Sequence, residues 1–391
     1  MKRFVYADNS ATTQVSPEVL EAMMPYFKEK YGNPSSIFTI GREAAAELLG
    51  YREKIAGLLG AKANEIYFTG SGSEADNFAI KGAARANAKK GKHLITTVFE
   101  HHAVLNTMKS LEKEGFEVTY LKVNSDGLIS PKQLEEAIRP DTTLVSMMYA
   151  NNEIGTILPI KELAAVAKAH GVLFFTDAVQ AVGNIPVNVK DLGVDMLSLS
   201  GHKIHAPKGI GLLYIKSGTR VLNLIDGGGQ ERGKRGGTEN LAYIAGLAKA
   251  LEIAIEKLPD MERVKKLRDR LIKEISKIPY SVINGSLTER LPGNVNAAFE
   301  FIEGESLLLT LDHEGICAST GSACSSNSLE PSHVLLSIGL PVEKAHGSLR
   351  ISLSHENTDE DVDYILEKLP EAVKKLRLMS PLYSEEKYGK L

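Results

Sequence analysis

The sequence of 391 residues contains no tryptophan and only two cysteines, and it has no long hydrophobic run. Cys317 and Cys324 cannot build a disulfide framework, which favours a reducing cytoplasm as the location. No apolar run approaches the roughly 20 residues of a membrane span, and the apolar stretch after Lys2 and Arg3 is too short for a signal peptide. The formal net charge is −3 with both signs evenly mixed, so neither nucleic acid nor an anionic membrane is expected as a partner.

The pattern of apolar residues predicts an α/β fold, and the length predicts two domains. From Glu65 onward, short apolar runs alternate with helical segments, which is typical of a mainly parallel sheet covered by helices on both faces. The predicted strands are 65–68, 94–99, 118–123, 144–149, 173–176, 196–199 and 211–215. The predicted helices are 43–59, 75–88, 131–138 and 160–170, with another that starts at Pro17 after the capping residue Ser16.

The composition changes near Glu256, where a second domain is predicted to begin. Apolar residues then recur at helical spacing with charges between them, which indicates an amphipathic helix. These apolar residues are Met261, Val264, Leu267, Leu271 and Ile275. Short strands are predicted within 292–301 and 315–319, and Thr358 is predicted to cap a last helix.

A lysine at the end of a predicted strand suggests amine chemistry. Ligands of parallel sheets bind beyond the carboxyl ends of the strands, and Lys203 comes shortly after the strand 196–199. Poor solvation there lowers the pKa of an amine and makes it available as a nucleophile or base. Lysines that form Schiff bases with pyridoxal 5'-phosphate (PLP) need that environment, although most lysines are solvated surface charges.

Other strand ends supply what a PLP cofactor needs. Asp177 is costly to bury without a cation, and a protonated pyridine nitrogen is such a partner. The turn 70–74 opens a helix and offers backbone N–H groups, with the Ser73 hydroxyl, to a phosphate. His101 suits ring stacking or proton transfer; the alternatives are a surface histidine or a metal ligand, but no third ligand has a clear spacing. Each of these features alone has an ordinary structural explanation. All of them together, in this order along the chain, are hard to explain by a purely structural role.

Longer motifs resemble those of the cysteine desulfurases. Two of them are Thr-Asp-Ala-Val-Gln180 and Leu-Ser-Gly-His-Lys203. The other matching stretches are 8–13, 31–36, 150–155, 206–209, 227–233, 235–240, 321–325 and 329–333. The likeness runs from about residue 4 to about residue 382 and fits the NifS/IscS branch, which supplies sulfur for iron–sulfur clusters.

The resemblance implies a homodimeric PLP-dependent transferase of fold type I. Its large domain, residues 16–255, has a mainly parallel mixed sheet flanked by helices and binds the cofactor. A smaller α+β domain combines residues 1–15 with 256–391. No metal is implied.

The implied reaction converts L-cysteine to L-alanine and leaves the sulfur as a persulfide on Cys324. The loop 319–332, which carries Cys324, is rich in serine and is predicted to be mobile. The sulfur then passes to an iron–sulfur scaffold protein of the IscU/NifU type, with the tail 380–391 as the candidate docking site.

By position, the resemblance gives each site residue a role. Lys203 is the Schiff-base lysine, and His101 stacks on the ring and carries a proton between substrate thiol and product. Asp177 faces the pyridine nitrogen, and Arg350 clamps the substrate carboxylate. The ring oxygen is assigned to Gln180 and Asn152. The phosphate is assigned to Gly72, Ser73, Ser200 and His202, with Thr238 reaching in from the other subunit.

Three other functions are compatible with parts of this set. An aminotransferase has no use for Cys324, and a selenocysteine lyase tolerates its loss. A non-enzymatic scaffold component does not need the intact set of Lys203, Asp177, His101 and Cys324. The desulfurase is therefore the preferred hypothesis.

Overall fold

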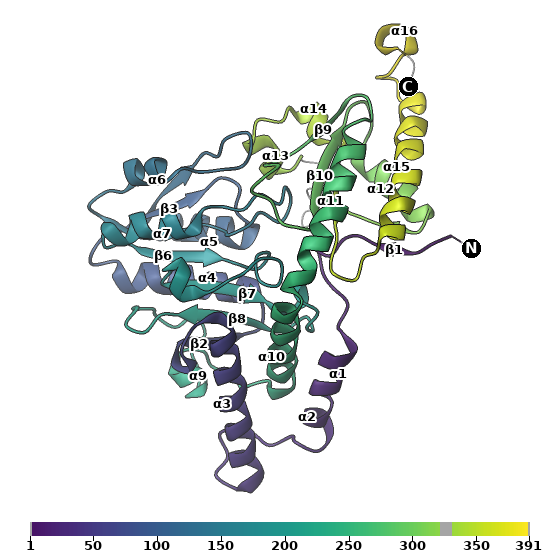
Figure 1. The fold of residues 1–391 in the computed structure, drawn as a ribbon. Coiled ribbons are helices and arrows are strands. Elements are labelled where there is room, and N and C mark those ends of the chain that lie inside the picture. Colours follow the sequence, from purple (N-terminus) through teal and green to yellow (C-terminus); the bar gives the residue numbers. More distant parts are fainter. Residues whose placement is uncertain (1, 321–330, 390–391) are drawn as a thin grey trace.

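A seven-stranded sheet forms the centre of the larger part of the molecule in this computed structural model, which describes residues 2–320 and 331–389 (Figure 1). The strand order is β2-β8-β7-β6-β5-β3-β4, and β8 alone runs antiparallel to its neighbours. The strands are β2 (Ile66–Thr69), β3 (His93–Thr97), β4 (Glu117–Leu121), β5 (Thr142–Ser146), β6 (Leu173–Asp177), β7 (Met196–Ser200) and β8 (Gly211–Ile215). The predicted mainly parallel mixed sheet is confirmed.

Three predicted strand ends were wrong. The predictions ran to Phe99, Val123 and Tyr149, but β3 ends at Thr97, β4 at Leu121 and β5 at Ser146. The apolar pattern continues past the strands because some of the residues that follow them, such as Phe99, are also buried. The pattern of apolar residues indicates which residues are buried, not which are hydrogen-bonded to a neighbouring strand. The predicted strand is therefore too long where the turn that follows it is also buried.

Helices cover both faces of this sheet (Figure 1). Phe174 packs in the hydrophobic cluster that includes α7, whereas its neighbour Phe175 packs in the cluster of α4 and α5. Such alternation places successive side chains of a buried strand on opposite faces. The helices of this part are α1 (Pro17–Met23), α2 (Pro25–Lys28), α3 (Thr39–Leu59), α4 (Gly72–Asn87), α5 (His102–Lys113), α6 (Pro131–Ala137), α7 (Ile160–Ala169), α8 (Val189–Leu192), α9 (Gln230–Gly233) and α10 (Leu241–Glu256). Short 3-10 turns are η1 (Ala63–Glu65), η2 (Gly201–Lys203) and η3 (Leu258–Asp260).

A second hydrophobic core joins the two ends of the chain. It combines Val5 and Ala7 with buried residues between Met261 and Val373. Its strands are β9 (Ser281–Ile283), β10 (Asn294–Phe299) and β12 (Ser348–Ser352), which form an antiparallel sheet, and β1 (Val5–Tyr6), which pairs in parallel with β11 (Ile316–Cys317). Helices α11 (Met261–Ile275), α12 (Gly304–His313) and α15 (Asp359–Met379) pack in this core. The C-terminal part also contains α16 (Glu385–Tyr388) and α13 (His333–Ser337) and α14 (Val342–Ala345), whose buried residues pack in the cluster that contains Phe174. The boundary between the two predicted domains stays a prediction.

Several local signals in the sequence match the structure. The Ser16 hydroxyl accepts a hydrogen bond from the Val19 N–H, and Pro17 is the first residue of α1. Thr358 caps α15, and the apolar stripe of α11 is buried as predicted. None of the described helices is long and apolar enough to cross a bilayer.

Candidate active site

A cavity of about 360 Å³ opens at the carboxyl ends of β6 and β7, beside the first turn of α4. Most of the predicted site residues line it together, although they come from distant parts of the sequence. Those in its wall are Gly72, Ser73, His101, Asn152, Asp177, Gln180, Ser200, His202, Lys203 and Arg350. The topology thus gathers the strand-end residues at one place, as expected for a parallel sheet.

Lys203 ends the short turn η2, which follows β7 directly. Its Nζ donates hydrogen bonds to the carbonyl oxygens of Ser10, at 2.6 Å, and Ala11, at 2.7 Å. Gly201 makes the tight turn possible, because a Cβ there would lie only 2.7 Å from Ile210 Cγ2. The amine is therefore held at a fixed position in the cavity wall.

Two buried carboxyl groups border the same cavity. Asp177 ends β6 and accepts a hydrogen bond from the Val179 N–H at 2.9 Å. Burial raises the pKa of Asp177 to about 6. Asp76, on α4, accepts a bond from the Ser198 hydroxyl at 2.6 Å, and burial, with the nearby charge of Asp177, raises its pKa well above the ordinary value. A cation placed here is stabilised by these carboxyl groups, which suits a protonated pyridine nitrogen.

The first turn of α4 is suited to a phosphate. Ser71 caps the helix by accepting a hydrogen bond from the Glu74 N–H, and the helix begins at Gly72. A Cβ on Gly72 would lie 3.0 Å from Val179 Cγ2 and 3.1 Å from Ser200 Cβ, so only glycine fits without a shift. The N–H groups of this turn and the hydroxyl of Ser73 border the cavity, as an anion site at a helix N-terminus requires.

His101 precedes α5 and caps it. Its Nδ1 accepts a hydrogen bond from the Ala103 N–H at 3.1 Å, so the neutral ring carries its proton on Nε2. Burial, and then the charge of Lys203, lower the pKa of His101 to about 4. At neutral pH the ring is therefore uncharged, which suits stacking and leaves an Nε2–H that donates.

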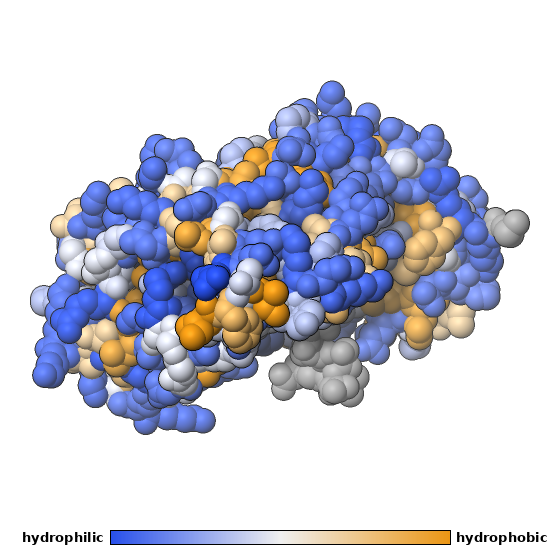
Figure 2. All heavy atoms as spheres, turned by 90° about the horizontal axis from the view of Figure 1, so that it is seen from below, coloured by the Kyte–Doolittle hydropathy of each residue, from blue (hydrophilic) through white to orange (hydrophobic). Residues whose placement is uncertain are grey.

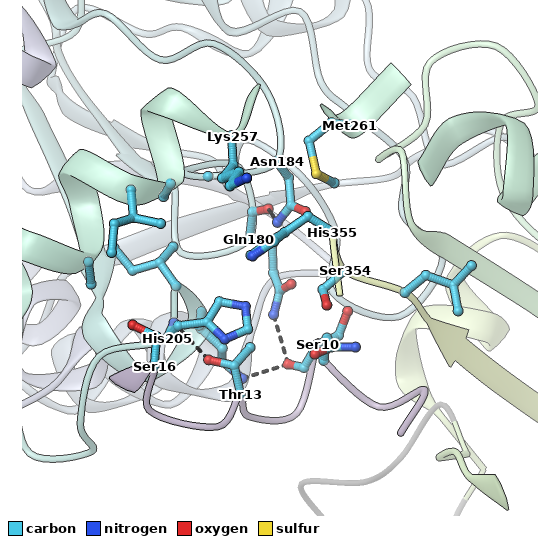
Figure 3. A pocket seen from close by; sticks show the side chains of 18 residues that line it. Ser10, Thr13, Ser16, Gln180, Asn184, His205, Lys257, Met261, Ser354 and His355 are labelled. Atoms are coloured by element: carbon cyan, nitrogen blue, oxygen red, sulfur yellow. Dashed lines mark hydrogen bonds between the residues drawn. The ribbon is translucent and has the colours of Figure 1, made fainter. Parts of the chain in front are cut away.

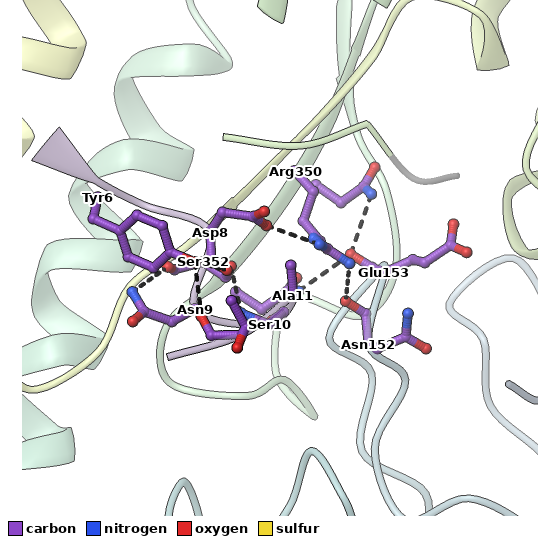
Figure 4. A network of polar contacts seen from close by, with 12 residues as sticks. Tyr6, Asp8, Asn9, Ser10, Ala11, Asn152, Glu153, Arg350 and Ser352 are labelled. Carbon is purple, nitrogen blue, oxygen red and sulfur yellow. Dashed lines mark hydrogen bonds and ion pairs between the residues drawn. The ribbon is translucent and has the colours of Figure 1, made fainter. Parts of the chain in front are cut away.

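Arg350, on β12, has a guanidinium group with spare donor capacity (Figure 4). Its side chain is 2% exposed; Nη1 donates to the Asn152 carbonyl oxygen at 3.1 Å and Nη2 to Asp8 Oδ1 at 2.9 Å. Its buried Nε–H has no hydrogen-bond acceptor among the described residues. Leaving such a donor unpaired costs about 1–3 kcal/mol, which a bound carboxylate offsets.

Comparison with known proteins decides the family. The class-V aminotransferase model matches residues 5–365. The cysteine desulfurase IscS of Clostridium botulinum strain Hall is 55% identical over 389 residues, covering 98% of this chain and 98% of that protein. The IscS of Methanosarcina thermophila is 57% identical over 383 residues, covering 98% of this chain and 95% of that protein. The chain belongs to the cysteine desulfurase family.

Solved structures agree with this assignment. A NifS-like protein superimposes with a TM-score of 0.90 at 41% identity and covers 96% of this chain and 100% of its own. A structure titled "SspA in complex with cysteine" gives a TM-score of 0.80 at 39% identity, covering 92% of this chain and all of its own. The fold is that of the fold-type-I PLP enzymes, and the cofactor of this desulfurase is PLP. The amine, the buried carboxyl groups and the glycine-bounded phosphate turn fit that group.

Thr238 is exposed and does not line the cavity. Cys324, the predicted sulfur acceptor, lies outside the described residues. The residues that flank the undescribed stretch do contact the site. Ser319 exchanges two backbone hydrogen bonds with Arg350, and the Ser332 hydroxyl donates to the buried carboxylate of Glu153.

Some residues of the site were missed by sequence reasoning. Asp76 was not singled out, although an aspartate among the apolar residues of a helix that covers a sheet is a signal of a buried polar site. Ser10 and Ala11 belong to the matching stretch 8–13, which was assigned no role in the site from the sequence. They contribute only backbone carbonyl oxygens, which no side-chain pattern can reveal.

Proposed function

We propose that this desulfurase converts L-cysteine to L-alanine and transfers the sulfur to Cys324, from which an iron–sulfur scaffold protein receives it. The observation that carries the proposal is a single cavity that joins the Lys203 amine, the buried Asp177 carboxyl and the Arg350 guanidinium with its unpaired Nε–H. These are an amine for the cofactor aldehyde, a partner for the pyridine nitrogen and a donor for the substrate carboxylate. The arrangement therefore suits an α-amino acid on PLP.

The proposed cofactor contacts follow from these positions. Lys203 would hold the aldehyde carbon and Asp177 the pyridine nitrogen, while Gln180 and Asn152 would face the ring oxygen. The phosphate would be held by Gly72, Ser73, Ser200 and His202. When bound, PLP supplies an electron sink that makes the α-hydrogen of the substrate acidic.

The protein's own groups then act in sequence. Arg350 binds the substrate carboxylate and orients the substrate. The Lys203 amine takes the α-proton and holds it, because the carbonyl oxygens of Ser10 and Ala11 accept its N–H groups, and the proton is returned as alanine forms. Proton storage on Lys203 thus requires no rearrangement of the cavity wall.

Sulfur transfer needs a nucleophile and a proton carrier. The Cys324 thiolate attacks the substrate sulfur, so that a sulfur–sulfur bond forms and the carbon–sulfur bond breaks. The electron pair of the broken bond stays with the β-carbon, which takes up a proton to give alanine. We assign proton transfer between substrate thiol and product to His101, whose imidazole ring lines the same cavity.

We also propose that the protein is a homodimer. Large apolar side chains are exposed on α1, α2, the connection between α2 and α3, and the start of α3. Figure 2, which looks at the molecule from that side, shows apolar residues gathered on this face. They include Leu20, Phe27, Tyr31, Ile37, Phe38 and Ile40. A monomeric soluble protein rarely exposes so much apolar surface, and a second copy of the chain would cover it. The exposed Thr238 would then be free to reach the phosphate of the partner subunit.

The scaffold protein is proposed to dock on the tail 380–391 and on the loop 319–332. Supporting this, Leu378, Met379 and Leu382 are exposed where the tail leaves α15, while Tyr383 is buried. The rings of Tyr383 and of Tyr388, which lies on α16, both pack on the ring of Phe301. These contacts hold the start of the tail in place. We further propose that the protein is located in the cytoplasm. We also propose that residues 16–255 form one domain and that residues 1–15 and 256–391 together form the other.

The two cysteines of the chain provide the test. Reconstituted protein is given L-cysteine and a reductant, and alanine and sulfide are measured. We expect equal amounts from the native protein and from Cys317→Ala, whose thiol lies on β11, and neither product from Cys324→Ala. Sulfide release that survives in Cys324→Ala would move the protein to the lyases, and transamination products would identify an aminotransferase.

A further inference from the structure

The segment of residues 8–13 connects the two parts of the proposed active site. At its start, the Asn9 N–H donates to the Ser352 carbonyl oxygen at 3.1 Å, and the Ser10 N–H donates to the Ser352 hydroxyl at 2.9 Å. At its end, the Thr13 N–H and hydroxyl both donate to the carbonyl oxygen of His202, at 2.9 and 3.0 Å. One short segment thus runs from β12, which carries Arg350, to the turn that carries Lys203.

Asp8 fixes the direction of the Arg350 guanidinium. The ion pair between Asp8 Oδ1 and Arg350 Nη2 is 2.9 Å long, and the Asp8 side chain is 19% exposed. Figure 4 shows Asp8 on one side of the guanidinium and Asn152 on the other. Since both terminal nitrogens already have an acceptor, the group cannot turn without breaking a charge-assisted bond.

The two carbonyl oxygens that follow fix the Lys203 amine. Ser10 and Ala11 each accept one N–H from Nζ, and the Ser10 carbonyl also accepts the side-chain amide of Gln180 at 3.0 Å. Carbonyl oxygens only accept, so they favour the protonated amine over the neutral one. The segment therefore sets where Lys203 holds a proton.

Hydrogen bonds rather than close packing hold the segment on its other side. Ser10, Thr13 and Ser16 border a second cavity of about 60 Å³, opposite His355 (Figure 3). A void of that size has room for a few water molecules. Because no side chain fills it, the position of the segment depends on its polar contacts.

We propose that the 8–13 segment is a positioning element that fixes the carboxylate-binding guanidinium of Arg350 relative to the Lys203 amine, with Asp8 as the residue that orients the guanidinium. This rests on the proposed function, since it takes Arg350 and Lys203 in the roles assigned there. The segment makes the site selective for ligands that carry an amine and a carboxylate on the same carbon. Asp8 acts through Arg350 and is a positioning residue, not a catalytic one.

The test measures carboxylate recognition without turnover. The dissociation constants of L-alanine and of ethylamine, which is alanine without its carboxylate, are determined from the change in cofactor absorbance. In Asp8→Ala, L-alanine should bind about tenfold more weakly or worse, because a bond to a charged group is lost, while ethylamine binding is unchanged. Asp8→Asn keeps an acceptor oxygen in the same place and should bind L-alanine within about threefold of the native protein.

A matched control removes an ion pair near the N-terminus, outside the 8–13 segment. Arg3 pairs with Asp361 at 2.7 Å at the surface and is not among the contacts of Arg350 or Lys203 described above. Arg3→Gln should leave both dissociation constants unchanged. Unfolding of the apoproteins shows separately whether any variant is simply less stable.

Each outcome separates the two proposals. Unchanged L-alanine binding in Asp8→Ala, or an equal loss for ethylamine, overturns the positioning role of Asp8. Arg350→Gln is the reference variant: if it also leaves L-alanine binding unchanged, the carboxylate role of Arg350 in the proposed function fails instead. A loss in Asp8→Asn as large as in Asp8→Ala also overturns the inference, because orientation would then not be the cause.

Discussion

The ion pair of Arg52 and Glu231 should contribute far more to stability than a surface pair of the same geometry. Two bonds of 2.8 and 2.7 Å join the guanidinium to the carboxylate, and Glu231 also accepts the Phe68 N–H at 3.0 Å. The side chains are only 8% and 3% exposed. Glu231→Gln removes the counter-charge and leaves a buried arginine, which costs about 3–5 kcal/mol of unfolding free energy.

A surface pair supplies the control. Arg85 and Glu114 also form two bonds, at 3.0 and 2.7 Å, but their side chains are 39% and 37% exposed. Because water and salt screen such a pair, Glu114→Gln should cost no more than about 1 kcal/mol. Chemical denaturation of the apoproteins measures both losses under the same conditions.

A double variant tests the cause. Arg52→Met with Glu231→Leu removes both charges, so most of the loss should be recovered. Recovery should be incomplete, because the Phe68 N–H then has no acceptor; the Ile66 carbonyl oxygen keeps Arg232 as a donor. Equal losses for Glu231→Gln and Glu114→Gln, or a double variant less stable than Glu231→Gln alone, would refute the reasoning.

Three further outcomes are expected. Asp177→Asn should weaken PLP binding by about 2–5 kcal/mol, measured by equilibrium dialysis, because the pyridinium loses its buried counter-charge; an unchanged affinity would contradict the assignment. Burial raises the pKa of Glu100 to about 8 from 4.5, so its stabilising contribution is full below about pH 4.5 and disappears as the pH rises to 8. Glu100→Gln should therefore lose less stability between pH 5 and 8 than the native protein, in unfolding experiments at several pH values. Ile37→Glu should shift the protein toward the monomer in sedimentation velocity, whereas Leu309→Glu, at an exposed position of α12, should not.

The central sheet was predictable because its strands are short apolar runs with both faces buried. The strand β12 was missed because Ser348, Arg350 and Ser352 alternate with apolar residues, so it lacks a continuous apolar run. All of its residues are nevertheless buried, because Arg350 belongs to a site rather than to a surface. Helix α10 was missed for the opposite reason: it is apolar on most sides and buried, and it shows little periodicity.

The site residues that contribute side chains could be predicted from the sequence, whereas those that contribute only backbone carbonyl oxygens could not. Lys203 and Asp177 are identifiable because a charged residue at the end of an apolar strand needs a reason. The carbonyl oxygens that hold Lys203 depend on a contact between residues far apart in the sequence, which only the fold brings about. The pairing of Asp8 with Arg350 is of the same kind, since the two residues meet through the second core.

The position of the transferred sulfur shows most directly whether Cys324 is its acceptor. Reconstituted native protein is exposed once to L-cysteine without reductant, and its cysteine peptides are then analysed by mass spectrometry beside an assay of alanine. We expect one added sulfur atom on the peptide of Cys324, none on that of Cys317, and one alanine for each sulfur bound. Alanine formed together with free sulfide, while Cys324 carries no sulfur, would contradict this role of Cys324.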